Sequence, residues 1–274
     1  MGNNYGGGRN VTLDVAKGIS ILLMTLTHLV VFNGHPGIKS FNSEVLMIFK
    51  MPLFIFVSGY LFSGERGFKE FIKKKFDGLV KPVVTILFLS AIVISGVWIL
   101  GGGEVHAAFG HVRNVLSLYY IPLWFPVTLF LSLIAFKVLL SVWRADKSYS
   151  LPGCMAIVVL LAIASRSGAD LYILKFHAIL YFMIFLAAGY LVRKRDMLEG
   201  LLNFRSFISF VSIFILSIVL KGYLGIGLDL NANIFGDFIT TVIASFSGVI
   251  ILVNISKWLA GIKYVSSILA ACSR

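Results

Sequence analysis

The sequence predicts an all-α fold, namely a polytopic membrane helix bundle with about eight transmembrane helices and both termini in the cytoplasm. Of its 274 residues, 58% are hydrophobic and 13% are charged, whereas about 25% of the residues of an average soluble domain are charged. Apolar runs that approach the length needed to cross a bilayer, about 20 residues, recur along the whole chain. The period-two alternation of a transmembrane β-barrel does not appear in the sequence.

Eight apolar runs are the predicted spans, and the loops between them set their direction. The runs are approximately residues 15–32, 45–62, 82–100, 121–143, 151–164, 172–192, 207–224 and 238–255. Basic residues gather in the loops that follow the even-numbered runs, and such loops stay in the cytoplasm. Residues 1–12 form a glycine-rich tail that we expect to be flexible, and residues 13–274 form a single transmembrane domain.

The net charge of +12 raises the question of nucleic-acid binding. The basic residues lie in short loops between apolar runs, which is the pattern of membrane orientation, so nucleic acid is not an expected partner. The two cysteines, Cys154 and Cys272, are far apart in the sequence. They predict neither a disulfide framework nor a metal site.

The first span contains three ionisable residues, Asp14, Lys17 and His28. Helical geometry places Lys17 and His28 within about 20° of each other on one face and roughly 16 Å apart along the axis. Asp14 precedes Lys17 by one turn and joins the same stripe. Such groups usually face a bundle interior or a water-filled cavity. Alternatively, Asp14 and Lys17 lie at the membrane interface, and His28 hydrogen-bonds to a neighbouring helix.

The second span places Lys50 near the middle of the membrane, two residues before Pro52, with Glu44 at its outer end. Proline removes a backbone hydrogen bond and leaves a carbonyl without its helical partner. Lys50 is therefore either a functional group or a cation that neutralises Glu44 or binds freed carbonyls.

The segment between the second and third spans is amphipathic, with apolar residues at helical spacing and basic residues between them. This pattern predicts an interfacial helix on anionic lipid. Its bases Lys73, Lys74 and Lys75 are also suited to attract a phosphorylated cytoplasmic ligand. At the start of the fourth span, Trp124 belongs to a group of aromatic residues typical of the membrane interface.

Three of these stretches together resemble the integral-membrane acyltransferase family 3, and in particular its fucose 4-O-acetylase-like branch. They are LDVAKGISILLMTLTH at residues 13–28, MPLFIFVSGYLFSG at residues 51–64 and LWF at residues 123–125. The first looks like the family's opening signature, an acidic residue and a basic residue followed eleven positions later by histidine. The resemblance covers most of the chain and is strongest up to residue 125.

The resemblance implies an O-acetyltransferase in the bacterial cytoplasmic (inner) membrane. Such an enzyme moves an acetyl group from cytoplasmic acetyl-CoA, without a metal, to a hydroxyl of a cell-surface or lipid-linked saccharide such as O-antigen, capsule or exopolysaccharide. The expected partners are the saccharide acceptor, the acyl-CoA donor and membrane lipids. A second copy of the chain, in a homo-oligomer, is a further candidate partner.

The resemblance also suggests roles for the polar residues. His28 is implied as the catalytic residue, because an imidazole with a pKa near neutral can take the proton of an attacking hydroxyl. Lys17 is implied as its cationic partner. Because Lys17 lies near the cytoplasmic end of the helical face that it shares with His28, we expect it on the side of the CoA donor. We expect the remaining candidates to serve as follows: Lys50 in catalysis, Asp14, Lys73, Lys74 and Lys75 in donor binding, and Glu44 and Trp124 in saccharide binding.

The sequence departs from this family at two places. The branch usually has histidine where Lys50 stands, and the family usually has about ten spans, of which the last two are not present here. A small-solute transporter, whose path would be lined by the same intramembrane charges, is one alternative. An inactive remnant of an acyltransferase is the other.

Overall fold

The computed structural model describes residues 4–5, 9–33, 45–63, 67–101, 123–142, 159, 176–220, 223, 228–229, 234–235 and 237–272. These residues are mainly helical, as the composition predicts. They fall into two compact units. Unit 1 comprises Met1–Phe62, Met155–Ala169 and Leu180–Arg274, and unit 2 comprises Ser63–Cys154 and Asp170–Ile179.

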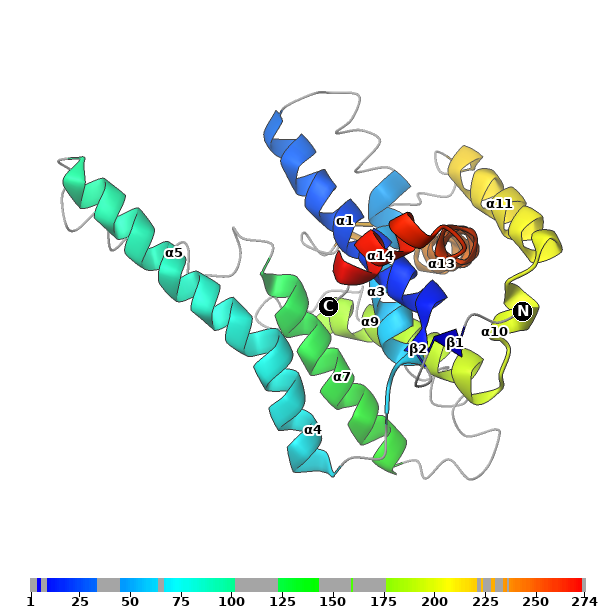
Figure 1. Cartoon of the computed structure of the whole chain (residues 1–274), viewed down its shortest axis with the longest axis horizontal. Helices are drawn as coiled ribbons and strands as arrows, with labels where there is room; N and C mark the ends of the chain where they lie inside the picture. The colour runs from blue at the N-terminus through cyan, green and yellow to red at the C-terminus, as the bar shows by residue number, and fades with distance from the viewer. Residues whose placement is uncertain are drawn as a thin grey trace. The chain divides into compact units, whose positions relative to one another are not determined.

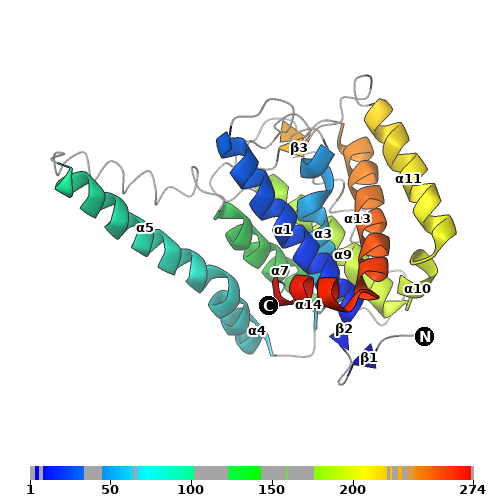
Figure 2. The ribbon, with the colours of Figure 1, turned by 45° about the horizontal axis from the view of Figure 1, so that its top comes forward.

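Unit 1 is a bundle of helices arranged around α13. Its helices are α1 (Val11–Asn33), α3 (Met47–Tyr60), α9 (Phe176–Lys194, from Leu180 onward), α10 (Leu198–Leu201), α11 (Phe204–Val219), α13 (Phe238–Ala260) and α14 (Lys263–Cys272). Helix α13 contacts α1, α3 and α11, and α14 crosses α1 (Figures 1 and 2). Because α13 packs on several sides, its small side chains and glycine are buried along most of its length.

Two short antiparallel strand pairs accompany these helices and depart, within the described residues, from the all-α prediction. Strand β1 (Asn4–Tyr5) pairs with β2 (Arg9–Asn10), and β3 (Leu228–Asp229) pairs with β4 (Ile234–Phe235). Each strand has two residues, which is too short to build a core sheet.

Glycines allow the closest approaches between helices of unit 1. A Cβ atom at Gly59 of α3 would meet the main chain of Leu186 in α9, and one at Gly189 of α9 would meet the main chain of Phe56 in α3. Gly18 of α1 lies in the same way against the carbonyl of Leu269 in α14. Small residues at such crossings let apolar helices pack backbone to backbone, which is a main source of helix association in membranes.

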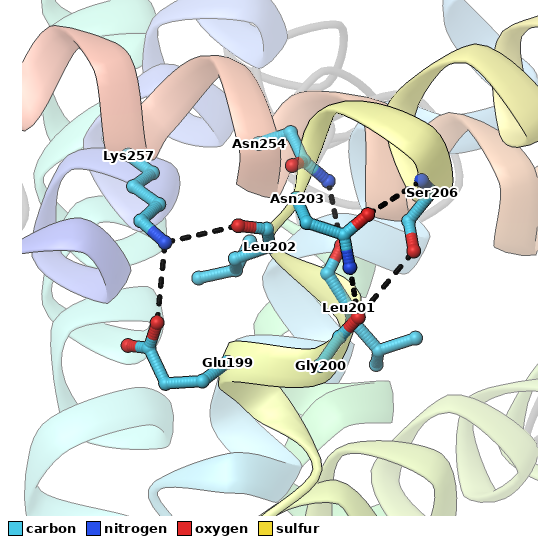
Figure 3. A network of polar contacts seen from close by, with 8 residues as sticks. All are labelled: Glu199, Gly200, Leu201, Leu202, Asn203, Ser206, Asn254 and Lys257. Carbon is cyan, nitrogen blue, oxygen red and sulfur yellow. Dashed lines mark hydrogen bonds and ion pairs between the residues drawn. The ribbon is translucent and has the colours of Figure 1, made fainter.

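A polar network fastens the end of α10 to the last turns of α13 (Figure 3). Lys257 Nζ donates to Glu199 Oε2 at 3.1 Å and to the carbonyl of Leu202 at 2.9 Å. Asn254 Nδ2 donates to the carbonyl of Leu201 at 3.1 Å. These two side chains satisfy carbonyls that the short helix α10 leaves without a helical partner.

Unit 2 contains one long helical rod and a second helix beside its first part. The rod consists of α4 (Phe68–Lys75), a π-helical turn η2 (Phe76–Val80) and α5 (Lys81–Leu100), and the second helix is α7 (Trp124–Val142) (Figure 1). The sequence predicted an interfacial helix and a separate span that begins at Pro82. Instead the two are continuous, because the wider turn places Pro82, which has no N–H, at the first positions of α5.

Four helices of the described residues are long and apolar enough to cross a membrane, namely Phe68–Val97, Trp124–Ser141, Phe176–Lys194 and Phe238–Ala260. They correspond to the third, fourth, sixth and eighth predicted spans. The second and seventh correspond to the shorter apolar helices α3 and α11, and the first lies within α1. The fifth, residues 151–164, lies outside the described residues except for residue 159. The helices point to a membrane protein, and the total of eight spans stays a prediction.

Candidate functional site

Helix α1 carries the three ionisable residues of the first motif. It runs without interruption from Val11 to Asn33, so Asp14, Lys17 and His28 belong to one helix. Asp14 lies in the first turn, where the helix dipole favours a negative charge. The surroundings of the His28 side chain lie outside the described residues, as does Glu44 altogether.

Lys17 lies at the contact between α1 and α3. Its Nζ atom is 5.6 Å from the centroid of the Phe54 ring, within the range of a cation–π interaction. The side chain of Lys17 is half-buried. Lys17 is therefore packed at the α1–α3 contact, and its position at the membrane interface or in a functional stripe stays a prediction.

Lys50 is the most deeply buried of the described candidate residues, with 3% of its surface exposed. Its Nζ atom donates a hydrogen bond to Thr27 Oγ1 at 2.8 Å. Its main-chain carbonyl accepts a hydrogen bond from Ser20 Oγ at 2.6 Å. A lysine ammonium is costly to bury without such partners, so α1 provides the environment in which Lys50 is stable.

These contacts show how α1 and α3 are aligned. Lys17 meets Phe54, whereas Ser20 meets Lys50, so residue numbers rise along α1 as they fall along α3. The helices are antiparallel. Lys50 contacts Ser20 through its main-chain carbonyl and Thr27 through Nζ, and these two residues lie about 10 Å apart along the axis of α1. The Lys50 ammonium therefore lies at the turn of α1 that contains His28, the residue after Thr27.

Sequence reasoning missed both hydroxyl partners of Lys50. It considered Glu44 or freed carbonyls as partners. Glu44 lies outside the described residues, so that pairing stays a prediction, and the described residues add contacts of Lys50 with Ser20 and Thr27. A signal was present in the sequence, because residues seven positions apart lie on one helical face. Two small hydroxyl residues at that spacing in an apolar helix, facing a span with a buried lysine, are a detectable pattern.

The other candidates belong to unit 2. Lys73 and Lys74 are exposed on α4, and Lys75 is half-buried with its Nζ 5.8 Å from the ring centroid of Phe71. Phe71 is buried, and Nζ of Lys137, on α7, lies 4.8 Å from the centroid of the same ring. The sequence predicted the amphipathic helix and missed Lys137.

Trp124 is the first residue of α7 and is buried. Its indole contacts the ring of Phe125 edge to face, with centroids 6.2 Å apart. Burial and aromatic packing are the properties of a structural side chain. They do not assign it to a saccharide site, so that role stays a prediction.

The comparisons with known proteins bear on the whole chain. The profile of a family described as "Acyltransferase domain" matches residues 10–274. Nodulation protein NolL of Mesorhizobium japonicum is 28% identical over 222 residues, which is 74% of this chain and 56% of that protein. Nodulation protein NolL of Sinorhizobium fredii is 33% identical over 89 residues, which is 31% of this chain and 24% of that protein.

The matched regions leave much of these relatives uncovered. The chain spans about half the length of the first relative and a quarter of the second. No solved structure shows a significant match to this chain. The profile match includes all three motifs identified in the sequence, since it extends from residue 10 to residue 274.

Proposed function

Because the chain belongs to the family described as "Acyltransferase domain", we propose that it is a membrane O-acyltransferase. The proposed reaction moves an acetyl group from cytoplasmic acetyl-CoA to a hydroxyl of a cell-surface or lipid-linked saccharide. The family match supports acyl transfer. The similarity of the motifs at residues 13–28 and 51–64 to the fucose 4-O-acetylase-like branch supports the saccharide acceptor.

The observation that best supports this proposal is the position of the Lys50 ammonium, which binds Thr27 at the turn that contains His28. In the proposed reaction His28 takes the proton of the acceptor hydroxyl as its oxygen attacks the thioester carbonyl. The tetrahedral intermediate bears a negative oxygen, which the buried cation of Lys50 stabilises. The C–S bond then breaks, and the thiolate of CoA takes the proton from the His28 imidazolium.

Lys17 lies toward the other end of α1, roughly 16 Å along the axis from His28. This separation is too large for contact with the reacting carbonyl, and it suits the CoA portion of the donor. On unit 2, Lys73 and Lys74 are exposed cations that we assign to attraction of the CoA phosphates. The basic loops support a location in the bacterial cytoplasmic membrane with cytoplasmic termini.

Replacement of His28 tests the proposal. Purified chain in lipid nanodiscs is supplied with acetyl-CoA and candidate envelope saccharides, and acetate esters are measured by mass spectrometry. We expect His28→Ala to lower turnover by about 10²–10⁴-fold, the usual contribution of a general base. His177→Ala, which alters another histidine of an apolar helix, is the matched control and should retain activity. Unchanged ester formation by His28→Ala at equal protein level would refute the proposed reaction.

A transporter of small polar solutes is the second candidate. It is favoured by the buried Lys50 and the half-buried Lys17, because ionisable groups inside apolar helices often mark solute paths. Uptake of a solute into liposomes without any consumption of acyl-CoA would favour transport. An inactive remnant predicts neither activity.

A further inference from the structure

We infer that Thr27 is a positioning residue, whose hydroxyl oxygen holds the Lys50 ammonium at the turn of α1 that contains His28. The inference rests on the proposed function for its catalytic meaning. Its structural part, the coupling of Thr27 to Lys50, stands on the contacts alone. Thr27 is not one of the residues that the family signature in the first span singles out.

The hydrogen-bond pattern of Thr27 sets the direction of this contact. The Thr27 hydroxyl donates to the carbonyl of Met24 at 2.8 Å, so its single hydrogen points along its own helix. A hydroxyl has one hydrogen and two lone pairs. Toward Lys50 it therefore presents a lone pair, and Nζ is the donor across the 2.8 Å contact. Thr27 is thus arranged to accept a hydrogen bond from the Lys50 amine.

The Lys50 side chain is long and flexible, and two hydrogen bonds to α1 hold this residue, one at its main chain and one at Nζ. Ser20 binds the main-chain carbonyl, and Thr27 binds Nζ. Both partners lie on α1, seven residues apart, which places them on one face of that helix. Thr27 is 3% exposed and Ser20 is fully buried, so bulk water cannot substitute for either bond. Without the Thr27 hydroxyl, the amine would lose a hydrogen bond that directs it to the His28 turn.

The side-chain direction agrees with this role. In a helix, the Cα–Cβ bond tilts toward the N-terminus. In the antiparallel pair, the N-terminal end of α3 lies along the C-terminal half of α1, where His28 is found. The Lys50 stem therefore extends toward His28 and away from Lys17. A cation held in this way stabilises a developing oxyanion better than a mobile one, because no reorganisation is needed during the reaction.

The chain offers a set of variants that separates positioning from folding. Thr27→Val keeps the shape and removes the hydroxyl, and Thr27→Ser keeps the hydroxyl. Thr25→Val is the matched control, because Thr25 is exposed on the same helix and its hydroxyl binds the carbonyl of Ile21 at 3.0 Å. Loss of that local bond reproduces the helical effect of the substitution without any change at Lys50.

The activity measurement uses acetyl-CoA and the candidate envelope saccharides named above with the purified 274-residue chain. We expect Thr27→Val to lower kcat by about 10- to 100-fold with little change in the KM for acetyl-CoA, because the lost contact acts on transition-state charge. Thr27→Ser should stay within about threefold of the parent, and Thr25→Val should match it. A parental kcat in Thr27→Val, or an equal loss in Thr25→Val or Thr27→Ser, would overturn the assignment.

A thermal-unfolding cycle with Lys50→Met gives an answer that does not depend on activity. Thr27→Val should lower Tm by about 2 to 8 °C when Lys50 is present, because a buried charged donor loses its acceptor. In the Lys50→Met background the same substitution should change Tm by less than about 1 °C. Equal shifts in both backgrounds would overturn the inference. Coupling in this cycle together with an inactive parent would retain the contact and refute the proposed reaction instead.

Discussion

The close crossing of α3 and α9 at Gly59 and Gly189 gives a prediction whose sign is set by the structure. We expect Gly59→Ala to destabilise the protein, although alanine is the better helix former. A Cβ atom at Gly59 would lie 2.7 Å from both the carbonyl carbon and the Cα of Leu186. These atoms belong to the main chain, so they cannot rotate away, and the two helices must separate.

The magnitude follows from two opposing effects. Overpacking of a tight contact costs about 1–3 kcal/mol, and replacing glycine by alanine within a helix returns about 0.5–1 kcal/mol. At the middle of both ranges the net loss is about 1.25 kcal/mol, which for a chain of this size lowers Tm by roughly 2 to 5 °C. Gly189→Ala should behave alike, since its Cβ would lie 2.7 Å from the main-chain nitrogen of Tyr60.

Thermal unfolding of the purified protein in detergent measures this effect. Gly96→Ala is the matched control, because Gly96 is also within an apolar helix and a Cβ there would meet nothing within 4 Å. It should raise Tm slightly, by the helix-propensity gain alone. The double variant of Gly59 and Gly189 should lose less than the sum of the single losses, since the first substitution already separates the helices.

The reasoning is refuted if Gly59→Ala leaves Tm unchanged or raises it as Gly96→Ala does. Such a result would mean that α3 and α9 are not in backbone contact at this crossing. A loss in the double variant equal to the sum of the two single losses would likewise contradict a contact shared by Gly59 and Gly189.

Two further predictions concern the exposed bases and a helix cap. Replacing Lys73 and Lys74 together by glutamine should raise the KM for acetyl-CoA by about 3- to 10-fold at low salt and leave kcat unchanged. The difference in KM should shrink in about 0.5 M salt, because salt screens exposed charges. A KM equal to that of the parent at low salt would contradict the assignment of these lysines to CoA. Asn203→Ala should lower the free energy of unfolding by about 1 kcal/mol, because Asn203 Oδ1 caps α11 by accepting from the N–H of Ser206 at 2.8 Å. Thermal unfolding checks this. Asn203→Asp keeps the cap but loses the bond from Nδ2 to the carbonyl of Gly200, so it should recover only part of the loss in Tm.

Local pattern predicted which segments are helical and, in part, which of their side chains are buried. The amphipathic segment before the third span is an example, since Phe71 is buried while Lys73 and Lys74 are exposed, as their helical spacing indicates. The amphipathic segment and the third span were predicted as separate elements, and they form one continuous helix. A proline usually marks a helix start or kink, and here a π-helical turn carries the helix past it.

The contact partners of the buried side chains could not be predicted from the pattern of neighbouring residues. Lys50 was identified from its position in an apolar run, whereas its contacts with Ser20 and Thr27 depend on which faces of α1 and α3 meet. The same holds for Lys137, which meets the ring of Phe71 across two helices. A sequence shows the period of each helix but not its rotation or its depth against a neighbour.

The sequence by itself determined a helical membrane protein with an acidic, a basic and a histidine residue on one helix, because hydropathy and helical period are properties of consecutive residues. Only the tertiary structure decided that α3 runs antiparallel to α1. It also decided that Nζ of Lys50 binds Thr27, in the turn of α1 that contains His28. The tertiary structure likewise decided that α3 and α9 cross at Gly59 and Gly189. The physical reason is that these contacts join segments far apart in the chain, and packing selects one alignment of the helices among many that the same apolar runs would allow.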